Sequence, residues 1–204
     1  MNMTTSPRIY VACLASYNNG VLHGAWIDAD QSAEEIQAKV GTMLRASRYP
    51  NVLACPSCGS IDRGPKCAPC GRVRVPSAEE WAIHDFEGFA GIKLSESESF
   101  ETVAALAELA VEHGEAFAAW YDNETRDEDE VDEWAEQFQD AFAGTFRTVE
   151  EWAEEYAEDT GMLAEVPESL RRYFDFDSWA RDARLGGDIW TADTSEGIAV
   201  FWNH

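Results

Sequence analysis

The chain is poor in positive charge, and its basic residues are unevenly placed. Lys and Arg number 15 against 39 Asp and Glu, which gives a formal net charge of −24 over 204 residues. Residues 1–75 hold eight basic and five acidic residues, a net of +3, whereas residues 76–204 hold seven basic and 34 acidic residues, a net of −27. Such an acidic region repels phosphate, so we expect it to bind a basic protein surface and not nucleic acid.

Long apolar runs and catalytic motifs are also missing. The sequence has no run of about 18 apolar residues, so no transmembrane helix is expected. The N-terminal stretch MNMTTSPR lacks the apolar core of a signal peptide, and we expect a cytoplasmic, soluble protein. No phosphate-binding glycine loop, nucleophile elbow or catalytic cysteine–histidine constellation occurs, so the chain is not expected to be an enzyme.

Apolar residues make up 45% of the chain and aromatic residues 12%, which predicts folded domains and not disorder. The low ratio of lysine to arginine, three to twelve, leaves a salt-adapted acidic enzyme as an alternative. A salt-adapted protein would spread its acid along the whole chain. The uneven charge therefore favours a localised surface for a partner.

The region from Asp127 to Asp159 combines aromatic residues at helical spacing with a dense set of carboxylates. A helix over Asp129–Phe142 would carry an apolar stripe opposite an acidic face. The stripe contains Val131, Trp134, Ala135, Phe138 and Phe142. The acidic face contains Asp129, Asp132, Glu133, Glu136 and Asp140. The pattern predicts a helix that packs on one side and stays hydrated on the other.

The next segment repeats this plan. Thr148 and Glu151 have the spacing of a capping box, and Gly161 lies just past the expected end of the helix. The inward residues are Val149, Trp152, Ala153, Tyr156 and Ala157. The outward acids are Glu150, Glu151, Glu154, Glu155 and Glu158. A second acidic helix is therefore predicted.

The spacing of these acids suggests a function. The carboxylates between Asp129 and Asp140 cover roughly 16 Å of helix, and one strand of duplex DNA carries about one charge per 3.4 Å of axis. Such a face presents a DNA-like row of charge, although an ordinary solvated helix face has the same pattern. The candidate DNA-mimic carboxylates are Asp127, Glu128, Asp129, Glu130, Asp132, Glu133, Glu136, Asp140, Glu150, Glu151, Glu154, Glu155, Glu158 and Asp159.

Four of the five cysteines form two CxxC pairs. Cys55 and Cys58 form the first pair, Cys67 and Cys70 the second, and a glycine follows each pair. Two such turns supply the four thiolates of a structural zinc site, whose closed shell leaves no open position for catalysis. One structural Zn2+ per chain is predicted. Cys13 lies in an apolar run and is expected in the core.

The basic residues around the cysteines leave two interpretations open. Arg63, Lys66, Arg72 and Arg74 would suit a ribbon that binds nucleic acid. Residues 51–75 contain no aromatic side chain on which bases could stack, so we favour a small fold stapled by metal.

Residues 9–86 contain sequence patterns of strands and of a helix. The β-prone runs 9–17 and 21–27 flank Asn18-Asn19-Gly20 and predict a hairpin. Ser32 and Glu35 have the spacing of a capping box and predict a helix. Residues 81–86 fit a third strand, although Ser77 and Glu80 could instead cap a short helix.

The acidic helices lie between further predicted elements. A helix begins at residues 95–99 and is closed by Gly114. Two short helical pieces joined near Asp175 follow the acidic helices. Strands over 188–192 and 198–202 form a C-terminal hairpin.

Several segments resemble the ArdA family of antirestriction proteins, which are carried by mobile elements. Ile9-Tyr-Val-Ala and Gly24-Ala-Trp26 are similar to the start of the family, and Trp81-Ala-Ile-His-Asp-Phe-Glu87 is similar to its third strand. The most specific block is EYAEDTGMLAEVPESLRRYFDFDSWARD, residues 155–182. The resemblance covers the chain except residues 51–76, because the family form that we compare lacks these cysteines.

The resemblance implies a DNA mimic. ArdA proteins are acidic homodimers that occupy the DNA-binding groove of Type I restriction–modification enzymes, and the chain is expected to have the same partner and no catalytic activity. The family's antirestriction motif maps onto residues 162–176, where it is associated with the dimer contact. By resemblance, the motif and interface residues are Glu165, Val166, Pro167, Leu170, Tyr173, Phe174, Asp175 and Phe176.

The expected fold class is α+β, arranged by resemblance as an elongated chain of three small domains. Residues 1–98 form an N-terminal domain with the zinc ribbon inserted at 53–75, residues 99–143 a helical acidic domain, and residues 144–204 a C-terminal domain with the motif. The resemblance also favours a strand over residues 81–86. The alternative function is a zinc-ribbon regulator that binds nucleic acid and recruits a basic partner through its acidic region.

Overall fold

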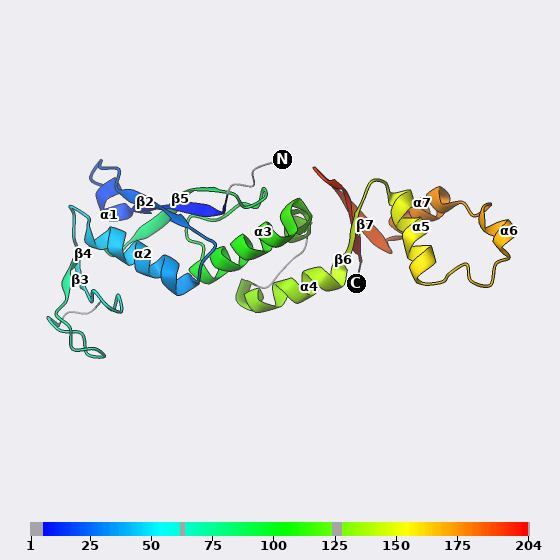
Figure 1. Ribbon diagram of the computed structural model, residues 1–204. Helices are drawn as coiled ribbons and strands as arrows, with labels where there is room; N and C mark the ends of the chain where they lie inside the picture. Colours follow the sequence, from blue (N-terminus) through cyan, green and yellow to red (C-terminus); the bar gives the residue numbers. More distant parts are fainter. Residues whose placement is uncertain (1–5, 62–63, 124–127, 204) are drawn as a thin grey trace. The chain divides into compact units, whose positions relative to one another are not determined.

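The computed structural model describes residues 6–61, 64–123 and 128–203 (Figure 1). Helices and antiparallel sheets are both present, which confirms the predicted α+β class. The chain divides into two compact units, Met1–Gly114 and Glu115–His204, and each is described by itself. The finer division into three domains stays a prediction. None of the described helices is long and apolar enough to cross a membrane.

A three-stranded antiparallel sheet with the order β2-β1-β5 forms the centre of the first unit. Its middle strand β1 (Arg8–Cys13) pairs with β2 (Gly24–Asp28) and with β5 (Trp81–Glu87). Helix α2 (Ala33–Arg45) lies along one face of the sheet (Figure 1). The strand predicted at residues 81–86 is therefore confirmed.

The predicted N-terminal hairpin is correct in its pairing but wrong in its extent. Strand β1 ends at Cys13, and the short helix α1 (Leu14–Tyr17) follows where a continued strand was expected. The amide of Asn18 donates to the carbonyl of Leu14, and the Asn19 side chain donates to the carbonyl of Ala15. These local hydrogen bonds stabilise a helical turn that β propensity alone does not indicate.

Helix α2 begins as the sequence predicts. The Ser32 hydroxyl accepts from the amide of Glu35, and the Glu35 carboxylate accepts from the amide of Ser32, so the capping box is complete. The residues that α2 buries are Ile36, Val40, Met43 and Leu44. Cys13 is buried as predicted.

The cysteine ribbon is inserted between α2 and β5. It begins and ends in the two-stranded pairing of β3 (Val52–Ala54) with β4 (Val75–Ser77). Because β4 continues to Ser77, the alternative of a helix capped by this residue is not observed. The chain therefore enters the insertion along one strand of a separate two-stranded sheet and leaves it along the other.

Helix α3 (Phe100–Asn123) is interrupted at Gly114, where φ is 57° and ψ is −138°. The hydroxyl of Ser99 accepts from the amide of Thr102 before the first turn. The sequence predicts closure at Gly114, and a second helical piece follows it. This backbone conformation requires glycine.

The second unit contains a sheet with the order β6-β8-β7. Strand β8 (Gly197–Trp202) pairs with β6 (Phe142–Phe146) and with β7 (Ile189–Thr194), which confirms the predicted C-terminal hairpin. The α-helix predicted over 129–142 is split. Its first part is the 3-10 helix η1 (Glu128–Glu133), only Trp134–Ala141 forms the α-helix α4, and Phe142 is extended because it pairs with Phe201 in the sheet.

Three further helices complete the second unit. Helices α5 (Val149–Asp159) and α7 (Phe176–Gly186) pack together, and the short α6 (Glu168–Arg171) lies between them in sequence. Asp175 caps α7, so the two helical pieces predicted to meet near this residue are confirmed. The core here contains Trp152, Ala153, Ala180, Ala183, Ile189 and Val200.

Candidate acidic surface and metal centre

Aromatic side chains hold helix α4 in place. Trp134 and Phe138 are almost completely buried, and the ring of Phe138 lies 5.5 Å from that of Phe117 and 4.9 Å from that of Phe142. The stripe predicted from helical spacing therefore faces the core. The acids at Asp132, Glu133, Glu136 and Asp140 are exposed on the other side.

Helix α5 repeats this arrangement. Trp152, Ala153 and Ala157 are buried, and the Trp152 and Trp179 rings stack with centroids 5.5 Å apart and an interplanar angle of 6°. The exposed acids of this helix are Glu150, Glu154, Glu155, Glu158 and Asp159. Each helix therefore combines an apolar anchor with a row of hydrated negative charge.

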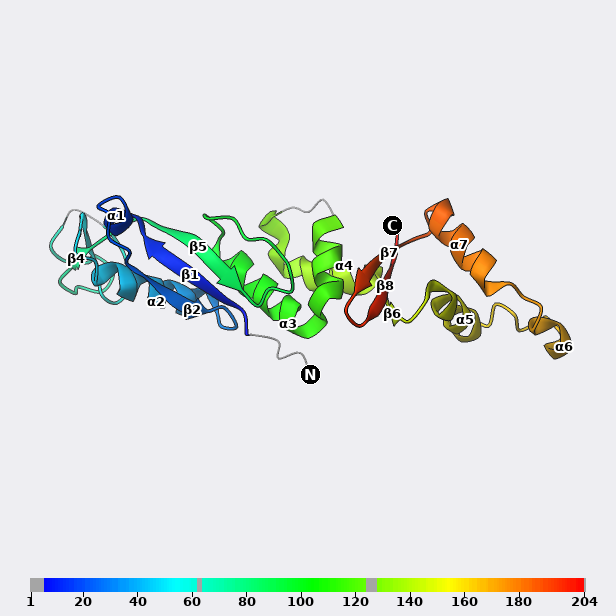
Figure 2. The same ribbon diagram turned by 90° about the horizontal axis from the view of Figure 1, so that it is seen from above.

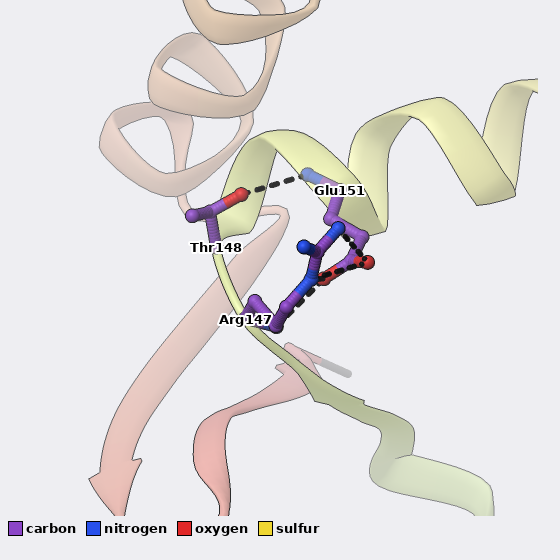
Figure 3. A network of polar contacts seen from close by, with 3 residues as sticks. All are labelled: Arg147, Thr148 and Glu151. Carbon is purple, nitrogen blue, oxygen red and sulfur yellow. Dashed lines mark hydrogen bonds and ion pairs between the residues drawn. The ribbon is translucent and has the colours of Figure 1, made fainter.

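Glu151, in the first turn of α5, is half-buried and is bound by a cation (Figure 3). The Arg147 guanidinium donates from Nη2 to Oε1 at 2.8 Å and from Nε to both carboxylate oxygens, and the Arg147 amide donates to Oε2 at 2.8 Å. These hydrogen bonds lower the pKa of Glu151 and raise that of Arg147. Thr148 accepts from the amide of Glu151 at 3.1 Å, as the predicted cap requires.

Four of the predicted mimic carboxylates are not placed by the structure. Asp127 lies outside the described residues, and the side chains of Glu128, Asp129 and Glu130 are also not described. The acidic surface is therefore built here from the carboxylates of α4, α5 and the end of η1.

The four cysteines predicted as metal ligands come together. Their Sγ atoms all lie within 4.8 Å of one another, with 3.4 Å between Cys55 and Cys70 and 3.5 Å between Cys58 and Cys67. This spacing is close enough for one metal ion to bind all four. Cys55 and Cys67 are buried, whereas Cys58 and Cys70 are exposed.

The two cysteine turns have the same backbone hydrogen bonds. The carbonyl of Cys55 accepts from the amide of Gly59, and that of Cys67 accepts from the amide of Gly71. Both glycines have positive φ, 69° and 68°. Each turn thus needs the glycine that follows its second cysteine, because other residues rarely adopt this conformation.

The thiols occupy unequal electrostatic environments. Hydrogen bonds from the amides of Cys58 and Ser57 lower the pKa of Cys55 to about 6. A hydrogen bond from the amide of Cys70 also lowers the pKa of Cys67. Burial and the neighbouring thiol groups outweigh this hydrogen bond and raise the pKa of Cys67 to about 12. Four thiolates this close repel one another unless a cation lies between them, so this donor set suits a metal.

Arg74 is part of the ribbon's internal structure, which the sequence did not indicate. Its side chain is buried, and it donates to the carbonyls of Ser60, Gly64 and Lys66 at 3.2, 2.8 and 2.7 Å. It therefore ties the loop between the cysteine turns to β4. Of the other predicted bases, Lys66 and Arg72 are exposed and Arg63 lies outside the described residues.

The segment expected to carry the antirestriction motif exposes large apolar side chains. Tyr173 is 72% exposed and Leu170 54%, and Glu165 and Pro167 are also exposed. Arg171 donates to the carbonyls of Val166 and Ala164, which closes the loop on itself. A compact loop with outward apolar side chains is the form that a contact surface takes.

The end of this segment joins the core. Phe174 and Phe176 are half-buried, with rings 4.8 Å apart, and Phe174 also lies against Trp179. Asp175 accepts from the amide and the hydroxyl of Ser178, and these hydrogen bonds lower its pKa. The observed contacts of Asp175 are those of a helix cap.

Comparison with known proteins gives one family. The model of the family described as "Antirestriction protein (ArdA)" matches residues 9–197, which is nearly the whole chain. No curated protein matches the sequence. The family match agrees with the resemblance seen in the strand and motif segments, and the chain belongs to the ArdA family of antirestriction proteins.

Proposed function

We propose that this protein is a DNA mimic that occupies the DNA-binding groove of Type I restriction–modification enzymes and excludes DNA by competition. ArdA is a non-enzymatic antirestriction family, and membership implies interaction with restriction–modification enzymes. No bond is made or broken in this mechanism, because carboxylates take the place of phosphates. We propose that the protein acts in the cytoplasm.

The observation that carries the proposal is the arrangement of α4 and α5. Both helices are anchored by buried aromatic residues, so their outward carboxylates are held on rigid elements. Glu150, Glu154 and Glu158 follow one another at intervals of four residues, about 6 Å of helix rise. The separation through space of neighbouring phosphates on one DNA strand is of the same order, because the strand winds around the axis while it rises about 3.4 Å per charge.

The amount of charge also fits a DNA ligand. Residues 76–204 carry a net charge of −27, and duplex DNA carries about one charge per 1.7 Å, so one chain matches roughly 46 Å of duplex. Two chains would match roughly two to three turns of the helix. The proposed assembly is a homodimer that buries the apolar side chains of residues 162–176, including Leu170 and Tyr173.

The metal in the proposal is one structural Zn2+ per chain, bound by Cys55, Cys58, Cys67 and Cys70. Tetrahedral zinc with Zn–S bonds of about 2.3 Å places its sulfur atoms about 3.8 Å apart, which is near the Sγ spacing described above. Its role is to hold the ribbon together.

A competition experiment tests the mimic mechanism. The protein is titrated into a Type I methyltransferase bound to labelled duplex, at low and at high salt. We expect the duplex to be released at low salt and progressively less as salt increases, because the contact depends on exposed charge. Polyglutamate at an equal concentration of charge is the control. Failure to release duplex at low salt with protein in large excess would sink the proposal.

The exposed bases of the ribbon support a second candidate, a zinc-ribbon regulator that binds nucleic acid. Lys66 and Arg72 are exposed beside the cysteines. This function would appear as direct binding of duplex by the free protein at moderate salt, lost in Cys55→Ser. No direct binding is expected from the mimic.

A further inference from the structure

The sheet of the first unit carries an ordered group of charged and aromatic side chains that the proposed function does not use. On β1, Arg8 is paired with Asp28 of β2 and with Glu87 of β5. Two residues further along, Tyr10 is paired with Trp26 and with Asp85. Directly paired residues, and residues two apart on one strand, point to the same face of a sheet. The face therefore has one row of Asp28, Arg8 and Glu87, and a second row of Trp26, Tyr10 and Asp85.

This face is the one opposite α2. Ile9 and Val11, which alternate with Arg8 and Tyr10, are completely buried. Trp26 is 42% exposed, although large aromatic side chains are normally buried. Figure 2 shows β1 and β5 without a helix in front of them. The group is accessible to a partner.

A guanidinium group already occupies this face. The Arg8 guanidinium carbon lies 4.7 Å from the centre of the Trp26 ring, and Nε of Arg8 donates to Oε1 of Glu87. Stacking on an indole and hydrogen bonding to a carboxylate are both interactions by which proteins hold an arginine side chain. Three carboxylates around one guanidinium leave the face with an excess of two negative charges.

The ring of Tyr10 lies where a side chain at position 24 would otherwise be, so its place depends on Gly24. A Cβ atom at this position would lie 2.7 Å from the Tyr10 hydroxyl oxygen and 2.5 Å from the carbonyl oxygen of Val11. Tyr10 therefore lies close against the backbone of β2, with its ring centroid 5.6 Å from that of Trp26. The two rings lie side by side next to the carboxylates, with an angle of 58° between their planes.

We propose that this face is a binding site for an arginine side chain of the target enzyme, and that Arg8 fills it in the free protein. The inference rests on the proposed function, because a protein surface that binds DNA is rich in arginine. Trp26 stacks on the incoming guanidinium and Glu87 accepts its hydrogen bonds. Arg8 is displaced easily, because its side chain and that of Glu87 are 42% and 37% exposed and their pairing is weak.

The test compares variants in the duplex-release assay. Arg8→Ala removes the internal competitor together with one positive charge, and Lys39→Ala removes one exposed positive charge from the same unit without touching the site. We expect Arg8→Ala to lower the protein concentration that releases half of the duplex by roughly two- to five-fold, which corresponds to the free energy of one exposed cation–π contact. Lys39→Ala should change this concentration less. Trp26→Leu should raise it by a similar factor. Thermal unfolding of each variant confirms that it is folded.

The proposed site would be overturned if Arg8→Ala and Lys39→Ala had equal effects, or if a folded Trp26→Leu protein inhibited as well as the wild type.

A wild-type protein that releases no duplex would instead contradict the mimic mechanism, and the arginine site is then tested separately by titration. The probes are hexa-arginine and hexalysine, added to ¹⁵N-labelled Arg8→Ala protein while the Trp26 indole signal is followed by NMR. The site predicts a larger, saturable shift with hexa-arginine, because guanidinium stacks on indole better than ammonium does. Equal shifts for the two peptides would contradict it.

Discussion

The guanidinium of Arg147 is bound to both carboxylate oxygens of Glu151, which lies in the first turn of the acidic helix α5. Because of this pairing, the negative charge of Glu151 is balanced locally by Arg147. It also explains why the capping box predicted for this helix is only half formed, since the Glu151 carboxylate accepts from the amide of Arg147 and not from that of Thr148.

Replacing Arg147 should make stability depend less on pH. The pKa of Glu151 is lowered in the folded state, so its pairing stabilises the protein above the unfolded pKa of about 4.3, and the contribution is lost as pH falls through the folded pKa. We expect Arg147→Gln to unfold at lower denaturant concentration than the wild type at pH 7. The difference should shrink as pH is lowered below the unfolded pKa. Arg184→Gln is the control, and a difference that does not change with pH would contradict the assignment.

Neutralising one face of α5 should weaken inhibition, and the free-energy losses of the separate charges should add. Exposed charge pairs contribute about 0.5 kcal/mol each, so one Glu→Gln change should raise the half-maximal inhibitor concentration about two-fold. The triple change Glu150→Gln, Glu154→Gln and Glu158→Gln should raise it roughly ten-fold. The measurement is duplex release at low salt, with unfolding curves to confirm the fold. A triple variant as potent as the wild type would show that α5 does not face the target.

Loss of one cysteine ligand should remove the metal. We expect about one Zn2+ per chain in the wild type by metal analysis, and little or none in Cys67→Ser, because a three-thiolate site leaves the shell incomplete. Acid should release the metal as well, since thiolates must be deprotonated to bind it. Cys13→Ala, which changes a buried cysteine outside the cluster, should keep its metal. Equal metal content in Cys67→Ser and the wild type would rule out the site.

Gly197 should not tolerate a side chain. Its φ is +147°, and a Cβ would lie 2.5 Å from the carbonyl oxygen of Phe146 on the paired strand. We expect Gly197→Ala to lower the free energy of unfolding by at least about 2 kcal/mol. Gly186→Ala is the matched control, because Gly186 is helical and its nearest neighbour would be 3.7 Å away. Similar melting temperatures for the two variants would contradict this account.

Charge placed on the exposed loop should separate the proposed dimer. Leu170 and Tyr173 are exposed in the single chain, so the double change Leu170→Asp and Tyr173→Asp should leave each chain folded. We expect the mass in sedimentation equilibrium to fall from that of two chains to that of one. Leu185→Asp, another exposed leucine of the same unit, is the control. A wild type that sediments as a single chain would refute the dimer.

Much of the local structure could be predicted from the sequence. Ser32 and Glu35 form the expected cap, Trp134, Phe138 and Trp152 are buried as helical spacing indicates, and the four cysteines meet as their spacing requires. These features depend on residues close together in the chain. The end of α4 could not be predicted, because Phe142 becomes extended through pairing with the distant Phe201.

The sequence by itself determined the acidic character, the four-cysteine cluster and the family, because charge, cysteine spacing and the motif segments are read along the chain. Only the tertiary structure decided that a base pairs with Glu151 and that some of the bases are internal. Glu151 is matched by Arg147, Arg74 is buried among carbonyls, and Arg8 lies on Trp26. Each of these depends on where a side chain lies in space and on what it contacts there, which composition and spacing do not contain.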